Sequence, residues 1–278
     1  MIASFDDAAM QTVTGLLREV AQREIKPRFG TLASHEIAQK SAVNDLVTTA
    51  DLETEKALSS ALGKLFSGST IIGEEAVAAD PSLLDTIGDA ELAFIIDPVD
   101  GTWNFAHGVP MFATMVAAVR KGETVAAWIH YPMSDDTLAA TRGGGAWRID
   151  VAGRAVRCRV SGRTRLEEMS GFMALPLFEP AHRRSLAASQ VGLAGVTSYF
   201  CSAYEYRMLV TGAKEFGLNG RLMPWDHAAG QLLHAEAGGH AALCDGRVYR
   251  PTITEGPFLL APDQSSWEEL NTLLARPD

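Results

Sequence analysis

Two short apolar runs of the sequence, residues 70–72 and 92–96, each end in acidic residues. Uninterrupted apolar runs of this length are typical of strands that are buried on both faces. The first run leads into Gly73-Glu74-Glu75, and the second leads into Asp97-Pro98-Val99-Asp100. Because the acidic side chains follow the strands directly, the pattern predicts a sheet that delivers carboxylates to a binding crevice at its strand ends.

Helices are predicted on the amino-terminal side of these strands. Apolar residues recur at helical spacing from about Asp6 to Phe29, and Gly30 follows as a helix-ending residue. A second helix is predicted to begin at Thr48 or Thr49, because Thr48-Thr49-Ala50-Asp51 has the form of a capping box, and to end near Ser67-Gly68. The apolar residues that we assign to its buried face are Leu52, Ala57, Leu58, Ala61, Leu62 and Leu65.

The rest of the chain divides into two regions. Apolar segments separated by turn residues predict an antiparallel meander at residues 111–120, 124–129, 137–141 and 146–149. Beyond about residue 153, strands alternate with helices, which is typical of an α/β lobe. The strands are expected at 169–173, 196–199, 214–218, 241–243 and 258–260, and the helices at 180–189, 201–211, 225–237 and 265–275. We therefore predict an α/β (α+β) protein with two lobes, residues 1–152 and 153–278, that share a cleft.

The composition excludes several classes of protein. A formal net charge of −10, without a cluster of basic residues beyond Arg183-Arg184, argues against a nucleic-acid-binding face. The three cysteines are scattered, so neither a disulfide framework nor a zinc knuckle is expected. The longest nearly apolar stretch, residues 109–119, is too short to span a bilayer, and the start does not have the pattern of a secretory signal. We expect a cytoplasmic protein without a membrane partner.

The acidic segments supply oxygen ligands for divalent cations. A proline restricts the backbone of the Asp97–Asp100 segment, which predicts a tight turn that brings both aspartates and the Val99 carbonyl toward one point. Glu74 and, far downstream, Asp226 complete a set of four carboxylates, which hard cations such as Mg²⁺ prefer. Two ions separated by about 4 Å, as in two-metal hydrolytic sites, fit this set.

Two predicted helix starts lie beside these carboxylates. If a helix begins at Gly101-Thr102, its free N–H groups can hold phosphate oxygens. Trp225-Asp226 also lies at a helix start, where the helix dipole counters negative charge. Taken alone, an Asp-Pro-x-Asp-Gly string is more often a solvated turn, and an aspartate at a helix start is more often an N-cap. Their joint occurrence in this order favours a metal-dependent phosphatase.

The same segments resemble the signatures of a known family. Residues 97–105, Asp-Pro-Val-Asp-Gly-Thr-Trp-Asn-Phe, resemble the first signature of the inositol monophosphatase family, within the lithium-sensitive, magnesium-dependent phosphatases, and residues 225–230 resemble the second. Residues 73–75 and 45–48, together with Asp51, match two further family elements. The resemblance implies a layered αβαβα sandwich of the sugar-phosphatase type, a homodimer and inhibition by lithium.

The resemblance also implies roles for individual residues. The expected ligands of two or three Mg²⁺ ions are Glu74, Asp97, the Val99 carbonyl, Asp100 and Asp226. The amides of Gly101 and Thr102 are expected to hold the phosphate. Catalysis is assigned to Thr102, Asp45 and Glu74, with the Thr102 hydroxyl, held by Asp45, orienting a metal-activated water.

The substrate side differs from that of inositol-selective members of the family. Such members usually carry an acidic residue seven positions before the aspartate of the second signature, where this chain has Asn219. An amide still forms a hydrogen bond with a hydroxyl, but without the assistance of a charge. We assign Asn219 and Ser202 to the substrate side, and we do not expect plain inositol monophosphate to be favoured.

Three functions are consistent with these features. The first is hydrolysis of a small phosphate monoester, such as an inositol phosphate, a sugar phosphate or histidinol phosphate, by a metal-activated water. The second is a bisphosphate phosphatase that acts on fructose 1,6-bisphosphate or an adenosine 3′,5′-bisphosphate and needs a second anion pocket. The arginines available for that pocket are Arg183, Arg184, Arg207 and Arg221. The third is a non-catalytic, phosphate-sensing interaction protein that keeps the metal site.

Overall fold

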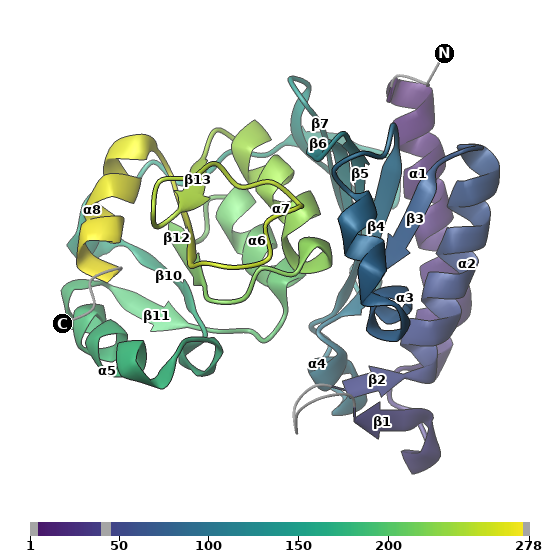
Figure 1. The fold of residues 1–278 in the computed structure, drawn as a ribbon, viewed down its shortest axis with the longest axis horizontal. Helices are drawn as coiled ribbons and strands as arrows, with labels where there is room; N and C mark the ends of the chain where they lie inside the picture. Colours follow the sequence, from purple (N-terminus) through teal and green to yellow (C-terminus); the bar gives the residue numbers. More distant parts are fainter. Residues whose placement is uncertain (1–4, 40–45, 275–278) are drawn as a thin grey trace.

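Two β-sheets alternate with pairs of helices in the computed structural model, which describes residues 5–39 and 46–274 (Figure 1). From one side of the molecule to the other, the layers are an outer helix pair, a seven-stranded sheet, a central helix pair, a five-stranded sheet and a second outer helix pair. In this order the helices are α1 (Asp7–Val20) and α2 (Thr49–Leu65), α6 (Ser202–Val210) and α7 (Pro224–Glu236), and α5 (Pro180–Ser189) and α8 (Gln264–Leu274). This arrangement confirms the predicted αβαβα sandwich.

The seven-stranded sheet places the first two acidic segments side by side. Its strands follow the order β3-β4-β5-β6-β7-β8-β9, and β3 is parallel to β4 while all other neighbours are antiparallel. The strands are β3 (Thr70–Gly73), β4 (Ala93–Asp100), β5 (Ala113–Arg120), β6 (Glu123–Tyr131), β7 (Asp136–Thr141), β8 (Gly145–Ile149) and β9 (Ala155–Arg157). Because β3 and β4 are parallel neighbours, their carboxyl ends meet at one edge. The meander is confirmed, and β9 is a strand that the sequence pattern did not predict.

The five-stranded sheet lies on the other side of α6 and α7. Its order is β11-β10-β12-β14-β13, in which β10 is parallel to β11 and β12, whereas β14 is antiparallel to β12 and β13. The strands are β10 (Ser170–Met173), β11 (Gly195–Thr197), β12 (Phe216–Asn219), β13 (His240–Leu243) and β14 (Phe258–Ala261). The strands and helices predicted for this region are present with small shifts at their ends. The lobe boundary at residues 152 and 153 stays a prediction.

The first predicted helix is α-helical only in its first part. α1 ends at Val20, and the chain continues as a π-helical turn (Ala21–Ile25) and a 3-10 turn (Lys26–Arg28) before Gly30, whose φ is 73°. The predicted extent of the helix is therefore confirmed, but its turns beyond Val20 are not α-helical. Apolar spacing does not distinguish these helix types, and the proline in the last turn cannot donate an N–H to an α-helical ladder.

The buried face of α2 carries two carboxylates. The predicted burial of Leu52 and Leu65 is wrong, since these side chains are 51% and 50% exposed. Leu58 and Leu62 are buried as predicted, but in the first two turns the buried face includes Asp51 and Glu55 instead of Leu52. The buried residues of α2 are Ala50, Asp51, Thr54, Glu55, Leu58 and Leu62.

Apolar clusters fill the spaces between the layers. The largest fills the space between the two sheets and includes residues of α6 and α7. The second lies between the seven-stranded sheet and helices α1 and α2, and the third lies between the five-stranded sheet and helices α5 and α8. Two short helices, α3 (Glu74–Ala79) and α4 (Thr102–Ala106), follow the acidic strand ends, and β1 (Ile37–Gln39) pairs with β2 (Leu46–Thr48).

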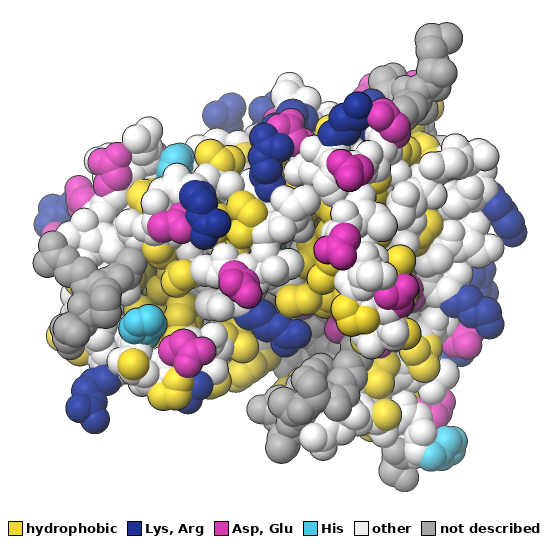
Figure 2. All heavy atoms as spheres, in the orientation of Figure 1, with side chains coloured by type: hydrophobic (Ala, Val, Ile, Leu, Met, Phe, Trp, Pro, Cys, Tyr) yellow, Lys and Arg dark blue, Asp and Glu magenta, His cyan; other side chains and the backbone are white. Residues whose placement is uncertain are grey.

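On the side drawn in Figure 2, Lys and Arg side chains are spread among Asp and Glu side chains rather than gathered in one patch. None of the described helices combines the length and the apolar character that crossing a bilayer requires. Cys158, Cys201 and Cys244 are free thiols, as predicted.

Candidate metal and phosphate site

Three predicted carboxylates meet at the end of β4. Asp97 and Asp100 come from that strand, Asp226 comes from the first turn of α7, and ligand atoms of the three lie within 4.8 Å of one another. Asp97 and Asp100 are buried, with 2% and 7% exposure. Glu74, at the start of α3, lines the same cavity of about 430 Å³ as Asp100 and Asp226. The fold thus brings together acidic residues that are far apart in the sequence.

A bulge, and not the predicted tight turn, aims both β4 aspartates at the site. β4 continues to Asp100, so the turn prediction is wrong. Asp97 lies opposite Met115 on β5. Asp100 lies opposite Ala113, so that three steps along β4 match two steps along β5. In a regular strand, side chains three positions apart face opposite sides, and the extra residue corrects this. Pro98, which cannot donate to the ladder, lies within the bulge.

The electrostatics of the cluster fit a divalent cation. Burial, reinforced by the charges of Glu74, Asp100 and Asp226, raises the pKa of Asp97 well above its usual range. Burial and the charge of Asp226 raise the pKa of Asp100 to about 7. Asp97 Oδ1 is buried and accepts no hydrogen bond within the described part of the chain. A hard cation among these oxygens would remove both the repulsion and the unsatisfied acceptor.

The Asp100 carboxylate also holds the start of α6. Its Oδ2 accepts hydrogen bonds from Ala203 N at 2.6 Å and from Cys201 Sγ at 2.9 Å. Its Oδ1 accepts one from Ser202 N at 3.2 Å. A carboxylate has about four lone-pair sites, so one remains for a metal. Cys201 was not identified from the sequence, because this contact bridges elements about a hundred residues apart.

Gly101 and Thr102 lie where α4 begins, as predicted. Gly101 precedes the helix with a φ of 86°, and a Cβ atom there would lie 2.7 Å from the Met111 carbonyl oxygen. Glycine is therefore required at this position. The Val99 carbonyl accepts a hydrogen bond from Thr102 Oγ1 at 2.9 Å and keeps a second lone pair. The phosphate role of the amides and the metal role of Val99 stay predictions.

Thr102 meets a different aspartate from the one that we predicted. Asp45 lies outside the described residues, so its contact with Thr102 stays a prediction. Thr102 Oγ1 lies 3.1 Å from Asp51 Oδ1. Asp51 Oδ2 accepts hydrogen bonds from Thr48 N at 2.8 Å and Thr48 Oγ1 at 2.6 Å, which confirms the capping box of α2. Burial raises the pKa of Asp51 to about 7.

Glu55 supports Glu74 from α2 and was missed in the sequence. Its carboxylate accepts hydrogen bonds from Glu75 N at 2.8 Å and Ala76 N at 2.9 Å, and so caps the start of α3. A Cβ atom on Gly73 would lie 2.1 Å from the carboxyl carbon of Glu55. The available signal was that Glu55 follows Asp51 by one helical turn on a face that is otherwise apolar.

The substrate side of the cavity contains both predicted residues and two others. Ser202 and Asn219 line it, together with Glu205 and Arg221. Of the four arginines considered for a second anion pocket, Arg221 alone is among the described lining residues. Arg207 forms an ion pair with Asp136 elsewhere. Glu205 was not singled out in the sequence, because a glutamate in the first turn of a helix is common.

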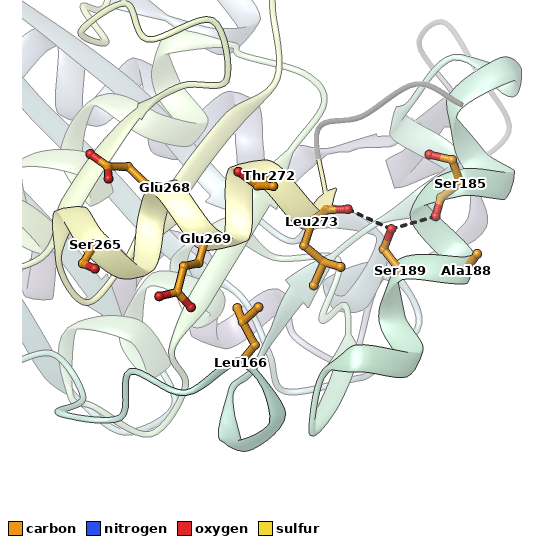
Figure 3. A pocket seen from close by; sticks show the side chains of 9 residues that line it. All are labelled: Leu166, Ser185, Ala188, Ser189, Ser265, Glu268, Glu269, Thr272 and Leu273. Carbon is orange, nitrogen blue, oxygen red and sulfur yellow. Dashed lines mark hydrogen bonds between the residues drawn. The ribbon is translucent and has the colours of Figure 1, made fainter.

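A larger cavity lies far from the acidic cluster in the fold. It has a volume of about 810 Å³ and lies between α5 and α8, where Ser189 Oγ donates a hydrogen bond to the Leu273 carbonyl (Figure 3). Its described lining residues are Leu166, Ser185, Ala188, Ser189, Ser265, Glu268, Glu269, Thr272 and Leu273. These residues offer two glutamates but no buried acidic cluster, so the smaller cavity lined by Glu74, Asp100 and Asp226 is the candidate site.

The raised pKa values predict that Mg²⁺ removes most of the pH dependence of stability. Without divalent cations, Asp100 holds its proton up to about pH 7 in the folded protein but only to about pH 3.9 when unfolded. The free energy of unfolding should therefore fall as the pH rises from 5 to 7.5, by about 2 kcal/mol. With Mg²⁺, which binds the ionised carboxylates, this fall should largely disappear. Urea unfolding at several pH values, with Mg²⁺ and with EDTA, measures it, and equal slopes would contradict the expectation.

Comparison with known proteins gives consistent matches over the chain. The model of a family described as "Inositol monophosphatase family" matches residues 4–276. The inositol-1-monophosphatase of Caulobacter vibrioides is 30% identical over 263 residues, which cover 93% of this chain and 94% of that protein. The fructose-1,6-bisphosphatase/inositol-1-monophosphatase of Thermotoga maritima is 30% identical over 209 residues, 73% of each chain. The solved structure of the extragenic suppressor protein SuhB from Bartonella henselae superposes with a TM-score of 0.81 at 26% identity, over 98% of this chain and 100% of that one.

Proposed function

Because the chain belongs to the inositol monophosphatase family of phosphoric monoester hydrolases, we propose that it is a Mg²⁺-dependent phosphatase that hydrolyses a small phosphate monoester. The observation that carries this proposal is the cluster of buried Asp97 and Asp100 with partly buried Asp226 at a cavity of about 430 Å³, in which one oxygen of Asp97 accepts no hydrogen bond from the described residues. A cluster of this kind is stable when cations neutralise it.

Two or three Mg²⁺ ions are part of the proposal. The residues that would hold them are Glu74, Asp97, the Val99 carbonyl, Asp100 and Asp226. When bound, Mg²⁺ lowers the pKa of a water molecule and stabilises the charge on the departing oxygen. Glu55 supports this arrangement by holding the first turn of α3, where Glu74 lies.

The protein's own groups position the phosphate and the water. The amides of Gly101 and Thr102 would bind phosphate oxygens at the start of α4. The Thr102 hydroxyl has one proton, which it can donate to Asp51 or to the Val99 carbonyl. Its Oγ1 can then accept a hydrogen bond from the attacking water, and this bond orients the water toward the phosphorus atom. Asp45 is part of the proposal as a second partner of the Thr102 hydroxyl.

A bisphosphate substrate is the second candidate. Arg221 is exposed and lines the cavity, so it is available for a second anionic group. The third candidate, a non-catalytic protein that senses phosphate, would bind phosphate esters without turnover. The homodimer implied by the family is also part of the proposal and can be tested by light scattering.

Phosphate release from a panel of esters tests these candidates. The panel contains inositol 1-phosphate, glucose 1-phosphate, histidinol phosphate, fructose 1,6-bisphosphate and adenosine 3′,5′-bisphosphate, each with Mg²⁺ and with EDTA. Mg²⁺-dependent release from a monoester supports the proposal, and a strong preference for a bisphosphate, lost in Arg221→Ala, favours the second candidate. Folded, Mg²⁺-loaded protein that releases phosphate from no ester would overturn the enzymatic proposal.

A further inference from the structure

Glu205 is a carboxylate of the substrate cavity that the phosphatase chemistry above does not use. It lies in the first turn of α6, and its side chain is partly buried. It lines both the main cavity and a small recess of about 10 Å³ that adjoins it. Ser202 and Asn219 also line both spaces, while the remaining recess residues are Phe172, Tyr206, Leu209, Gly217 and Leu260. The three polar side chains therefore lie where the recess and the main cavity share their lining, and the rest of the recess is largely apolar.

The two oxygens of Glu205 have different surroundings. Oε1 accepts hydrogen bonds from Tyr199 N at 2.8 Å and from Ser198 Oγ at 3.1 Å. Within residues 5–39 and 46–274, no hydrogen bond reaches Oε2. One oxygen thus fixes the orientation of the carboxylate, and the other is available to a ligand. A carboxylate held in place in this way loses little conformational freedom on binding.

The loop that Glu205 holds carries an aromatic ring at the cavity. Phe200 follows Tyr199 and has a φ of 51°, which is costly for a residue other than glycine. Its side chain is 61% exposed, and its ring lies 6.4 Å from the ring of Trp103. Both rings line the main cavity. An alcohol bound in this cavity can therefore contact both an aromatic ring and the carboxylate of Glu205.

The charge of Glu205 favours a donor as its ligand. Burial raises the pKa of Glu205 to about 7, so the ionised form lacks the solvation that it would have in water. A hydrogen bond from a ligand hydroxyl or ammonium would restore this stabilisation, and such charge-assisted bonds are stronger than neutral ones. The start of α6 also favours negative charge at this position.

We propose that Glu205 recognises the alcohol part of the substrate, with Oε2 accepting a hydrogen bond from a hydroxyl or ammonium group on a ring whose apolar face lies against Phe200 and Trp103. This inference rests on the proposed phosphatase function, because it concerns the leaving group of that reaction. It makes Glu205 a specificity-determining residue rather than a ligand of the metal. The substrate class that follows is a cyclic alcohol phosphate with a hydrogen-bond donor remote from the ester.

Matched substrates test the inference. Cyclohexyl phosphate lacks a donor, inositol 1-phosphate carries hydroxyls, and 4-aminocyclohexyl phosphate carries an ammonium group. The wild-type protein should have a higher kcat/KM for inositol 1-phosphate or for 4-aminocyclohexyl phosphate than for cyclohexyl phosphate. The better of the two shows whether Glu205 binds a hydroxyl or an ammonium group. In Glu205→Gln the amide oxygen can still accept from Ser198 and Tyr199, whereas the amide nitrogen cannot accept from a ligand. The preference over cyclohexyl phosphate should fall roughly 10- to 100-fold, mainly through KM.

A control and a binding measurement separate the possible outcomes. Ser198→Ala removes one bond to Oε1 but leaves the carboxylate, so it should keep most of the wild-type preference. Calorimetric titration of inositol and of 4-aminocyclohexanol into protein saturated with Mg²⁺ and inorganic phosphate measures the affinity for the alcohol alone. Glu205→Gln should lose affinity for the alcohol that carries the preferred donor. If Glu205→Gln lowered kcat/KM equally for all three esters, or left the preference over cyclohexyl phosphate unchanged, the proposed role of Glu205 would be overturned. Absence of turnover of every ester would overturn the phosphatase function instead, and the titration would then decide the Glu205 inference.

Discussion

Replacing Asp226 by asparagine is expected to lower kcat by about 100-fold or more while the fold stays intact. Asp226 lies in the first turn of α7, and its carboxylate approaches Asp97 and Asp100 within 4.8 Å. The change is nearly isosteric but removes one negative charge from the set that is proposed to hold Mg²⁺. Without divalent cations the variant should be more stable than the wild-type protein near neutral pH, because Asp226 contributes to the raised pKa values of Asp97 and Asp100.

Two measurements check this expectation. Phosphate release at increasing Mg²⁺ concentrations gives kcat, and urea unfolding in EDTA gives the stability. Asp245→Asn is a suitable control, since Asp245 is exposed and pairs with Arg247 on the surface, so kcat should not change. A wild-type kcat at saturating Mg²⁺ would remove Asp226 from the proposed ligands. A loss of kcat without the gain in metal-free stability would place its effect outside the carboxylate cluster.

Local patterns were enough to predict most strands and helices and the acidic strand ends, whereas the layered sandwich was predicted from the family resemblance. Apolar runs of strand length led into Glu74 and Asp97, and the parallel pairing of β3 with β4 places both at one edge. The capping box at Thr48 and the helix start at Thr102 were also predictable, because each depends on a few consecutive residues. Such features are encoded within one element or at its end.

Contacts between distant elements could not be predicted from local patterns. The bulge between Asp97 and Asp100 depends on the pairing of β4 with β5, which a tight-turn prediction ignores. The approach of Asp51 to Thr102 depends on how α2 packs against the sheet. Glu55 has an ordinary sequence context, and its role follows only from its contact with the start of α3. Tertiary packing, rather than intrinsic secondary-structure propensity, determines the contacts of such residues.

Helix α6 connects the acidic cluster with the substrate side. Its first amides bind Asp100, while Ser202 and Glu205 from the same turn line the cavity. The position of α6 therefore sets the distance between the phosphate end and the alcohol end of a substrate. A contact from Tyr131 Oη to the Ala203 carbonyl at 2.7 Å adds a second restraint at this end of the helix. The next turn is anchored by a charged pair.

Removing the cation of the Arg207–Asp136 pair should strongly destabilise the protein. Arg207 of α6 donates two hydrogen bonds of 2.8 Å to Asp136 of β7, and its guanidinium lies 4.4 Å from the centre of the Tyr131 ring. Burial alone would raise the pKa of Asp136, but the bonds from Arg207 lower it. Arg207→Met leaves Asp136 ionised and without this partner, so the free energy of unfolding should fall by about 3–5 kcal/mol.

Chemical unfolding of three variants tests whether the uncompensated charge is the cause. Arg207→Met combined with Asp136→Asn should recover part of the loss, because no unpaired charge remains. Arg247→Met removes the cation of an exposed pair and should not change stability measurably. Because α6 carries Ser202 and Glu205, Arg207→Met should also raise KM at temperatures where it stays folded. A stable Arg207→Met protein with wild-type KM would mean that the bidentate pair does not hold α6 in place.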